Sequence, residues 1–265
     1  MNATPAARAP RSTPAASGTP VLEARGLNKS FGAVSAASDV SVQFSTGSKV
    51  SLIGANGAGK TTFVNMVTGY LKPDTGAILL DGVDVTKKKP RAMTQLGVCR
   101  SFQIPQLCEP MTSVENLLVA FGASGRRFSL FRPCGSEGSE DEARAMLDRF
   151  GLSQYADRVV SELPGGVRKL LDIAMAMVRK PKVLLLDEPT SGVSADEKYP
   201  LMDTVMAALA HEDVTVLFVE HDLDIVTRYS DRVVAFYAGK IIADDLPDEV
   251  LSDDAVQKYV TGGPR

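Results

Sequence analysis

The stretch Gly54-Ala55-Asn56-Gly57-Ala58-Gly59-Lys60-Thr61 decides the fold of this chain. It fits the pattern G-x-x-x-x-G-K-[ST], a loop that wraps the phosphates of a nucleotide. Glycine permits positive φ angles and a close approach of the backbone to a ligand. The turned backbone points successive N–H groups at anionic oxygens, and the helix that follows adds its positive N-terminal end. The loop therefore predicts a phosphate-binding site.

The residues on both sides predict the strand and the helix that such a loop requires. Lys49–Ile53 is typical of a buried strand, and Thr62–Thr68 continues as a helix that Gly69 ends. Lys60 can reach the terminal phosphates, and the Thr61 hydroxyl can bind Mg²⁺. The other interpretation, a glycine-rich turn beside a lysine, is disfavoured once the strand and the helix are counted.

Composition and charge exclude several classes of function. The chain has 265 residues, of which 44% are hydrophobic and 23% charged, as in a globular protein with a large core. Its net charge of −3 provides no basic field, so we expect no nucleic acid as a partner. Three cysteines without C-x-x-C spacing and only two histidines favour reduced thiols over a zinc site. No apolar run is long enough to cross a membrane.

The order of the segments predicts an α/β fold with a mostly parallel sheet. Apolar strands at 182–186 and 214–219 are separated by helical stretches, as in sheets that helices cover on both faces. The periodicity is helical from about 112 to 179, and strand-like segments alternate with turns between 21 and 44.

Three segments at the edges of this pattern carry simpler expectations. Residues 1–20 are rich in Ala, Pro, Ser and Thr, which is typical of a disordered tail. The stretch 122–139 mixes Gly, Ser, Arg, Pro and Cys, which predicts a surface loop. A C-terminal helix is expected from about 248 to 259.

A second chemical signal lies at the end of the strand that contains Leu184–Leu186. This strand delivers Asp187 and Glu188 to its carboxyl end, where open α/β sheets bind ligands. Asp187 is a candidate to hold Mg²⁺, and Glu188 is a candidate to polarise an attacking water. Solvated acids at a strand end are the other interpretation, which the phosphate loop in the same chain disfavours.

These motifs, in this order, resemble the ATP-binding subunits of ABC transporters over about residues 21–262. The resemblance implies an ATP-binding domain over 21–265, built as a P-loop NTPase core with an N-terminal antiparallel β subdomain. It also implies a helical subdomain inserted at about 105–180. The ligands implied are ATP and Mg²⁺, and the implied activity is ATP hydrolysis coupled to transport.

Three further side chains take roles from this resemblance. Phe31 matches the aromatic residue that stacks on adenine, and such stacking is worth about 1–3 kcal/mol; a core phenylalanine is the alternative. Gln103 matches the glutamine that contacts Mg²⁺ or water and reports occupancy to the membrane subunit, although alone it is only a polar loop residue. His221 matches the switch histidine that bonds the γ-phosphate, and a structural histidine is the alternative.

The loop Leu163-Pro164-Gly165-Gly166-Val167 stands where the family carries Leu-Ser-Gly-Gly-Gln. In the family this loop begins a helix and presents N–H groups to the γ-phosphate of ATP bound by the other subunit. Gly165 and Gly166 keep the close approach, but Pro164 has neither the hydroxyl nor a backbone N–H. Ser194 stands where many members have Asp, so it can hydrogen-bond across an interface only without charge.

Both departures resemble variation within the subfamily that energises uptake of branched-chain or other hydrophobic amino acids, amides or urea. The resemblance implies a peripheral subunit at the cytoplasmic face of the inner membrane. Its implied partners are transmembrane permease subunits, a second ATP-binding subunit and a solute-binding protein. An exporter of lipid or lipopolysaccharide shares these motifs. A switch ATPase acting on DNA or the ribosome is disfavoured by the acidic balance and the lack of a basic stripe.

Overall fold

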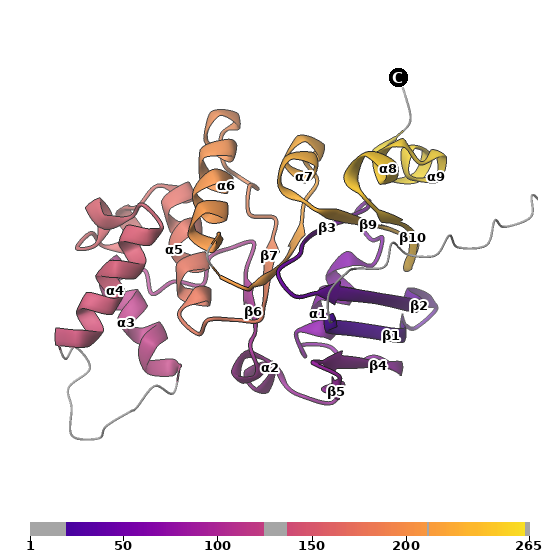
Figure 1. Cartoon of the computed structure of the whole chain (residues 1–265), viewed down its shortest axis with the longest axis horizontal. Helices are drawn as coiled ribbons and strands as arrows, with labels where there is room; N and C mark the ends of the chain where they lie inside the picture. The colour runs from indigo at the N-terminus through magenta and orange to yellow at the C-terminus, as the bar shows by residue number, and fades with distance from the viewer. Residues whose placement is uncertain (1–19, 125–136, 211, 263–265) are drawn as a thin grey trace, which may run out of the picture.

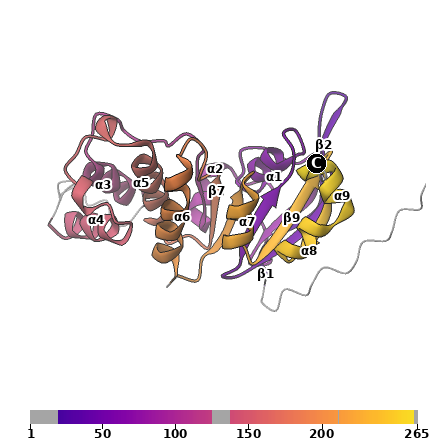
Figure 2. The ribbon, with the colours of Figure 1, turned by 90° about the horizontal axis from the view of Figure 1, so that it is seen from above.

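The computed structural model describes residues 20–124, 137–210 and 212–262, and it confirms the α/β fold. Within these residues the strands form two sheets, and helices cover them (Figure 1). Figures 1 and 2 place helices α3 (Ser113–Ala123), α4 (Glu137–Arg149) and α5 (Gly165–Met177) at one end of the molecule. They place α8 (Pro247–Ser252) and α9 (Asp254–Val256) at the other end. In the same residues no helix is both long and apolar enough to span a bilayer.

The larger sheet has the strand order β10-β9-β3-β8-β7-β6. Its neighbours pair in parallel except for the β9–β10 hairpin. All of β8 and most of β7 are buried, because both faces of a parallel sheet are covered. Its strands are β3 (Lys49–Ile53), β6 (Val98–Ser101), β7 (Val183–Asp187), β8 (Thr215–Val219), β9 (Arg232–Tyr237) and β10 (Lys240–Asp245).

The smaller sheet is antiparallel and contains the N-terminal strands, in the order β2-β1-β4-β5. Its strands are β1 (Pro20–Phe31), β2 (Val34–Ser45), β4 (Thr75–Leu80) and β5 (Val83–Asp84). Helix α1 (Lys60–Val67) joins the two sheets through the fully buried Phe63. The Phe63 ring centroid lies 6.2 Å from that of Phe44 in β2 and 5.5 Å from that of Phe236 in β9.

The remaining helices pack around the larger sheet, and α3, α4 and α5 lie beyond it at one end of the molecule (Figures 1 and 2). Helix α3 begins at a capping box in which Thr112 and Glu115 exchange hydrogen bonds, which explains its sharp start. The helices are α2 (Pro90–Leu96), α3 (Ser113–Ala123), α4 (Glu137–Arg149), α5 (Gly165–Met177), α6 (Ala195–Leu209), α7 (Leu223–Tyr229), α8 (Pro247–Ser252) and α9 (Asp254–Val256). The described residues also contain single turns of 3₁₀ helix at Ser153–Tyr155 and Val160–Glu162 and a π turn at Gln257–Thr261.

The single C-terminal helix expected from about 248 to 259 is wrong. Helix α8 ends at Ser252, and the Asp253 side chain accepts hydrogen bonds from the N–H groups of Ala255 and Val256. A side chain that caps a new helix start competes with continuation of the old helix, so the segment breaks there.

The two other edge segments lie mostly outside the described residues. Helix α3 runs to Ala123 and α4 starts at Glu137, so both helices extend into the ends of the stretch expected as a loop at 122–139. The rest of that stretch, with Cys134, is not among the described residues. The same holds for the expected tail except for Pro20, which begins β1.

Phe63→Ala tests whether α1 locks the two sheets together. Removing a fully buried ring that contacts Phe44 and Phe236 should lower the free energy of unfolding by about 3–5 kcal/mol. Urea unfolding followed by circular dichroism measures this change. Val83→Ala, at an exposed position of β5, is the control and should change stability by less than about 0.5 kcal/mol. Equal stability of both variants would contradict the packing described here.

Candidate functional site

The loop Gly54–Thr61 follows β3 and includes the first two residues of α1, and it packs against backbone from both sheets. Gly54 has φ 151°, and a Cβ there would lie 2.5 Å from the Phe236 carbonyl oxygen. Gly59 has φ 109°, and a Cβ there would lie 2.6 Å from the Ala36 carbonyl oxygen. Only glycine fits both positions, because any side chain would collide with backbone that cannot move aside. The loop is therefore held in a fixed curve.

Lys60 and the start of α1 point positive charge into this curve. Lys60 is buried, and its Nζ donates to the carbonyl oxygens of Gly54 and, at 3.2 Å, Ala55. Burial lowers the pKa of Lys60, while the charges of Glu188 and Asp187 oppose that shift. Helix α1 starts after Gly59 with no side-chain cap and no acidic residue in its first turn. Its first N–H groups can therefore bind an anion.

Glu188 is the meeting point of three segments. Its Oε2 accepts a hydrogen bond of 2.6 Å from Nε2 of Gln103, and its Oε1 lies 3.3 Å from Nε2 of His221. Its backbone oxygen accepts from Nζ of Lys169 on α5 at 2.9 Å. Glu188 has φ 49°, a conformation that non-glycine residues adopt rarely and often at functional sites. The structure thus brings together three residues that the sequence singled out.

Asp187 is paired with a residue that the sequence analysis missed. Arg100 of β6 donates to Oδ2 of Asp187 and, at 2.7 Å, to Oδ1 of Asn65 on α1. Both charged side chains are mostly buried, with 10% of Arg100 and 15% of Asp187 exposed. The Arg100 guanidinium also lies over the Phe102 ring, 5.1 Å from its centroid. The signal in the sequence that could have identified Arg100 was a charged residue inside an otherwise mostly apolar strand.

Glu220 was missed in the same way. It is buried and accepts hydrogen bonds from the N–H and hydroxyl of Thr190 and from the N–H of His221. It therefore ties the loop after Glu188 to the start of the segment that carries His221. The signal was an acid directly after the fully apolar end of β8, the pattern that identified Asp187 and Glu188 after β7.

The residues expected to hold Mg²⁺ offer suitable ligand types. Thr61, Gln103 and Asp187 carry hydroxyl, amide and carboxylate oxygens, which are the ligands that Mg²⁺ takes together with phosphate oxygens and water. Asp187 and the Gln103–Glu188 pair lie at the same edge of the sheet. The charge of Asp187 acts to raise the pKa of Lys60 in the loop. The donor set therefore fits this ion.

Phe31 lies at the tip of the β1–β2 hairpin, where it pairs with Val34. Its side chain is 52% exposed, so it is not a core phenylalanine. Ala36 of the same hairpin contacts Gly59 of the loop, which puts the hairpin tip beside the predicted phosphate site. Nζ of Lys29 lies 5.7 Å from the ring centroid. The ring therefore has Lys29 over it, and its exposed part can stack on a flat ligand near the loop.

The Leu163–Gly166 loop lies at the start of α5, with Leu163 buried and Pro164 at the N-cap. Figure 1 shows β6 and β7 between α5 and α1, and Figure 2 shows β7 between them, so this loop and the Gly54–Thr61 loop lie in different parts of the molecule. The Ser194 hydroxyl, at the N-cap of α6, donates to Oε2 of Glu197 at 2.8 Å. The structure does not bring 163–166 together with the other predicted site residues.

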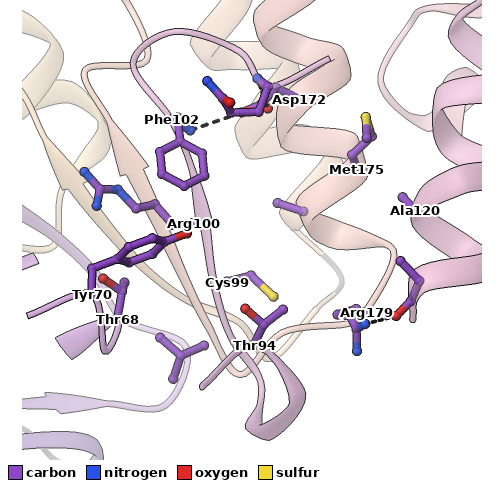
Figure 3. Close-up of a pocket in the computed structure, with 14 residues that line it drawn as sticks. Thr68, Tyr70, Thr94, Cys99, Arg100, Phe102, Ala120, Asp172, Met175 and Arg179 are labelled. Carbon is purple, nitrogen blue, oxygen red and sulfur yellow. Dashed lines mark hydrogen bonds between the residues drawn. The ribbon is translucent and has the colours of Figure 1, made fainter. Parts of the chain in front are cut away.

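A groove lies beside the Gln103 loop, because Phe102 and Gln106 on either side of Gln103 line it (Figure 3). It has a volume of about 220 Å³ and is lined by residues of β6, α3 and α5 and by the segments around α1 and α2. Arg100, Phe102 and Asp172 line it. Cys99 lies in the same wall, and burial raises the pKa of its free thiol to about 11.

Comparisons with known proteins agree with this geometry. Residues 37–191, more than half of the chain, match the ABC transporter family. A probable branched-chain amino acid transport ATP-binding protein of Archaeoglobus fulgidus is 33% identical over 91% of this chain and 95% of its own length. A high-affinity branched-chain amino acid transport ATP-binding protein of Pseudomonas aeruginosa is 35% identical over 91% of this chain and 98% of its own.

A solved structure supports the same assignment. It is the ADP conformation of an ATP-binding cassette of an ABC transporter, with a TM-score of 0.81, 33% identity and coverage of 90% of this chain and 97% of that one. The sequence matches to the two relatives extend over 91% of this chain. This chain belongs to the ABC transporter family, as one of its ATP-binding proteins.

Proposed function

We propose that this chain binds and hydrolyses ATP to power a membrane importer for branched-chain or other hydrophobic amino acids, amides or urea. The observation that carries the proposal is the contact of Gln103 and His221 with Glu188, at the sheet edge that also holds the Gly54–Thr61 loop. The relatives at 33–35% identity are named for branched-chain amino acid transport, which favours uptake over export of lipids.

The catalytic chemistry is positioning and electrostatics. Lys60 and the N–H groups at the start of α1 offset the charge of the β- and γ-phosphates. Glu188 accepts a hydrogen bond from the attacking water and orients it, and His221 donates to the γ-phosphate. In the structure both Glu188 oxygens already have a neighbour, Gln103 at 2.6 Å and His221 at 3.3 Å. The His221 contact is the longer of the two, and it is the one that breaks when the nucleotide and the attacking water bind.

Thr61, Asp187 and Gln103 would hold Mg²⁺ with the nucleotide. When bound, the ion neutralises phosphate charge that develops during transfer. Arg100 keeps Asp187 oriented toward the sheet edge through its ion pair and is itself held by Asn65. Phe31 supplies an exposed ring for the adenine base.

A second ATP-binding subunit would complete each site. The Leu163–Gly166 loop of one chain faces the nucleotide held by Gly54–Thr61 of the other, which explains why the two loops lie apart within one chain. If the two chains are identical, the contact is isologous. Closure on ATP then shifts the population toward the dimer, since the closed state binds the nucleotide better.

Permease subunits would bind at the groove beside the Gln103 loop, at the cytoplasmic face of the inner membrane. The groove wall includes Phe102 and Gln106, which flank Gln103 and the 75% exposed Ile104. A contact there senses the Gln103–Glu188 pair directly and moves the helical subdomain that we propose at about 105–180. A solute-binding protein completes the system and selects the solute.

Glu188→Gln should leave ATP binding intact and lower kcat by at least about 100-fold, because the amide cannot polarise the water as a carboxylate does. Phosphate release measures turnover, and calorimetry measures the ATP dissociation constant. Glu249→Gln, an exposed acid in α8, is the control and should behave as the wild type. Hydrolysis at the wild-type rate in the Glu188 variant would refute the assignment.

Lys60→Ala should weaken ATP binding by at least about 10-fold, since it removes the charge that faces the phosphates. Titration calorimetry with Mg²⁺ and, separately, with a chelator measures the affinity and its dependence on the ion. Lys72→Ala, at an exposed position after α1, is the matched control. If both variants bind ATP equally well and the wild type shows no dependence on Mg²⁺, neither Lys60 nor the ion belongs to the site.

Pro164→Ser restores the hydroxyl and the backbone N–H that the family's loop carries. With two more donors facing the partner's γ-phosphate, ATP-dependent dimerisation should tighten by about fivefold or more. Sedimentation with ATP in a Glu188→Gln background measures the dimerisation constant. Pro247→Ser, at the first residue of α8, is the control for the loss of a proline at a helix start. An unchanged constant counts against the proposed role of this loop.

A further inference from the structure

The Gln103 loop is attached to α5 at two points, and both attachments use one side chain. Oδ2 of Asp172 accepts hydrogen bonds from the Ser101 hydroxyl at 2.6 Å and from the Phe102 N–H at 3.2 Å. Oδ1 of Asp172 accepts from the Gln106 N–H at 3.1 Å. Figure 3 shows Asp172 reaching from α5 toward Phe102. The carboxylate therefore holds the backbone on both sides of Gln103.

Asp172 is not needed to pack α5. Its neighbours Leu171, Ile173 and Ala174 are at most 1% exposed and supply the apolar contacts of the helix. Asp172 itself is only 7% exposed, and burial raises the pKa of its carboxyl, while its three donors and the charge of Lys169 act in the opposite direction. A buried carboxylate is costly unless donors surround it, so its presence indicates that the loop backbone is what it serves.

Helix α5 also contacts Glu188, the hydrogen-bond partner of Gln103. Lys169, three residues before Asp172, donates to the backbone oxygen of Glu188. One rigid element thus holds Gln103 through Asp172 and Glu188 through Lys169. The helix begins at Pro164–Gly165, the loop that we assign to the partner's nucleotide.

We propose that Asp172 is a positioning residue that fixes the Gln103 loop to α5, so that the position of this helix sets whether Gln103 reaches Glu188. The inference rests on the proposed function. In the proposed dimer, each site combines the Gly54–Thr61 loop of one chain with the Pro164–Gly165 loop of the other, and α5 links the two sites. A nucleotide that draws one chain's Pro164–Gly165 loop also moves that chain's own Gln103. Such a link is a coupling free energy carried by one packed element.

Asp172→Asn tests the clamp. The substitution keeps the shape but turns one acceptor oxygen into an NH₂ group, which cannot accept a hydrogen bond from the backbone N–H of Phe102 or Gln106, whichever it faces. Site-resolved hydrogen exchange should show that the Phe102 or the Gln106 amide exchanges at least about 10-fold faster, because its hydrogen bond to residue 172 is lost. The kcat for ATP should fall by about 10-fold, while the ATP dissociation constant changes by less than about twofold.

Two further variants separate positioning from folding. Asp172→Glu keeps both acceptor oxygens and should return kcat to within about threefold of the wild type. Asp157→Asn removes an exposed acid that bonds only Arg144 among the described residues, and it should change neither exchange nor kcat. Thermal unfolding of each variant shows whether the fold is retained.

The outcomes are decisive in both directions. Unchanged exchange at both amides, or equal losses in affinity and kcat, would overturn the proposal, and so would an Asp172→Glu variant as slow as Asp172→Asn. Exchange is measured without nucleotide, so it judges the clamp even if the wild type neither binds nor hydrolyses ATP. That last result would instead defeat the proposed function.

Discussion

The close approach of backbone from β2 and β9 to the Gly54–Thr61 loop is the constraint on which the rest of the structure depends. The carbonyl oxygens of Phe236 and Ala36 leave no room for a Cβ at Gly54 and Gly59. Each oxygen comes from a different sheet, so the loop has its shape only when both sheets are in place. Phe63, packed against both sheets from α1, supplies the burial that holds them there.

The order of strands in the larger sheet decides the chemistry around that loop. Strands β6, β7 and β8 are neighbours and parallel, so the segments that follow them leave the sheet at one edge. Gln103, Glu188 and His221 come from these three segments. They are far apart in sequence, yet Glu188 touches the other two. The order of the strands in the sheet, rather than the local sequence, therefore brings these three residues together.

Helix α5 gives this edge a mechanical connection. Its Lys169 and Asp172 contact the backbone of Glu188 and of the Gln103 loop, and its first residues form the Pro164–Gly165 loop. A helix is stiff over this length, whereas the loops are not, so a displacement at one end is carried to the other. The groove beside the Gln103 loop is lined by the same helix. Nucleotide contact, water positioning and permease contact would then share one moving part.

The sequence by itself determined the glycine-rich loop Gly54–Thr61, the strands on which it depends and the acids at the end of β7, because each is a local pattern of glycines, apolar runs and charges. It could not show that Arg100 pairs with Asp187, that Glu220 joins Thr190 to His221, or that Asp172 holds the Gln103 loop. Nor did it show that Asp253 would start a new helix at the C-terminus. Only the tertiary structure decided the contacts of Arg100, Glu220 and Asp172, because a buried charge takes the partners that strand order and helix packing bring to it. Asp187, Thr190 and the Gln103 loop lie tens of residues from these three side chains along the chain.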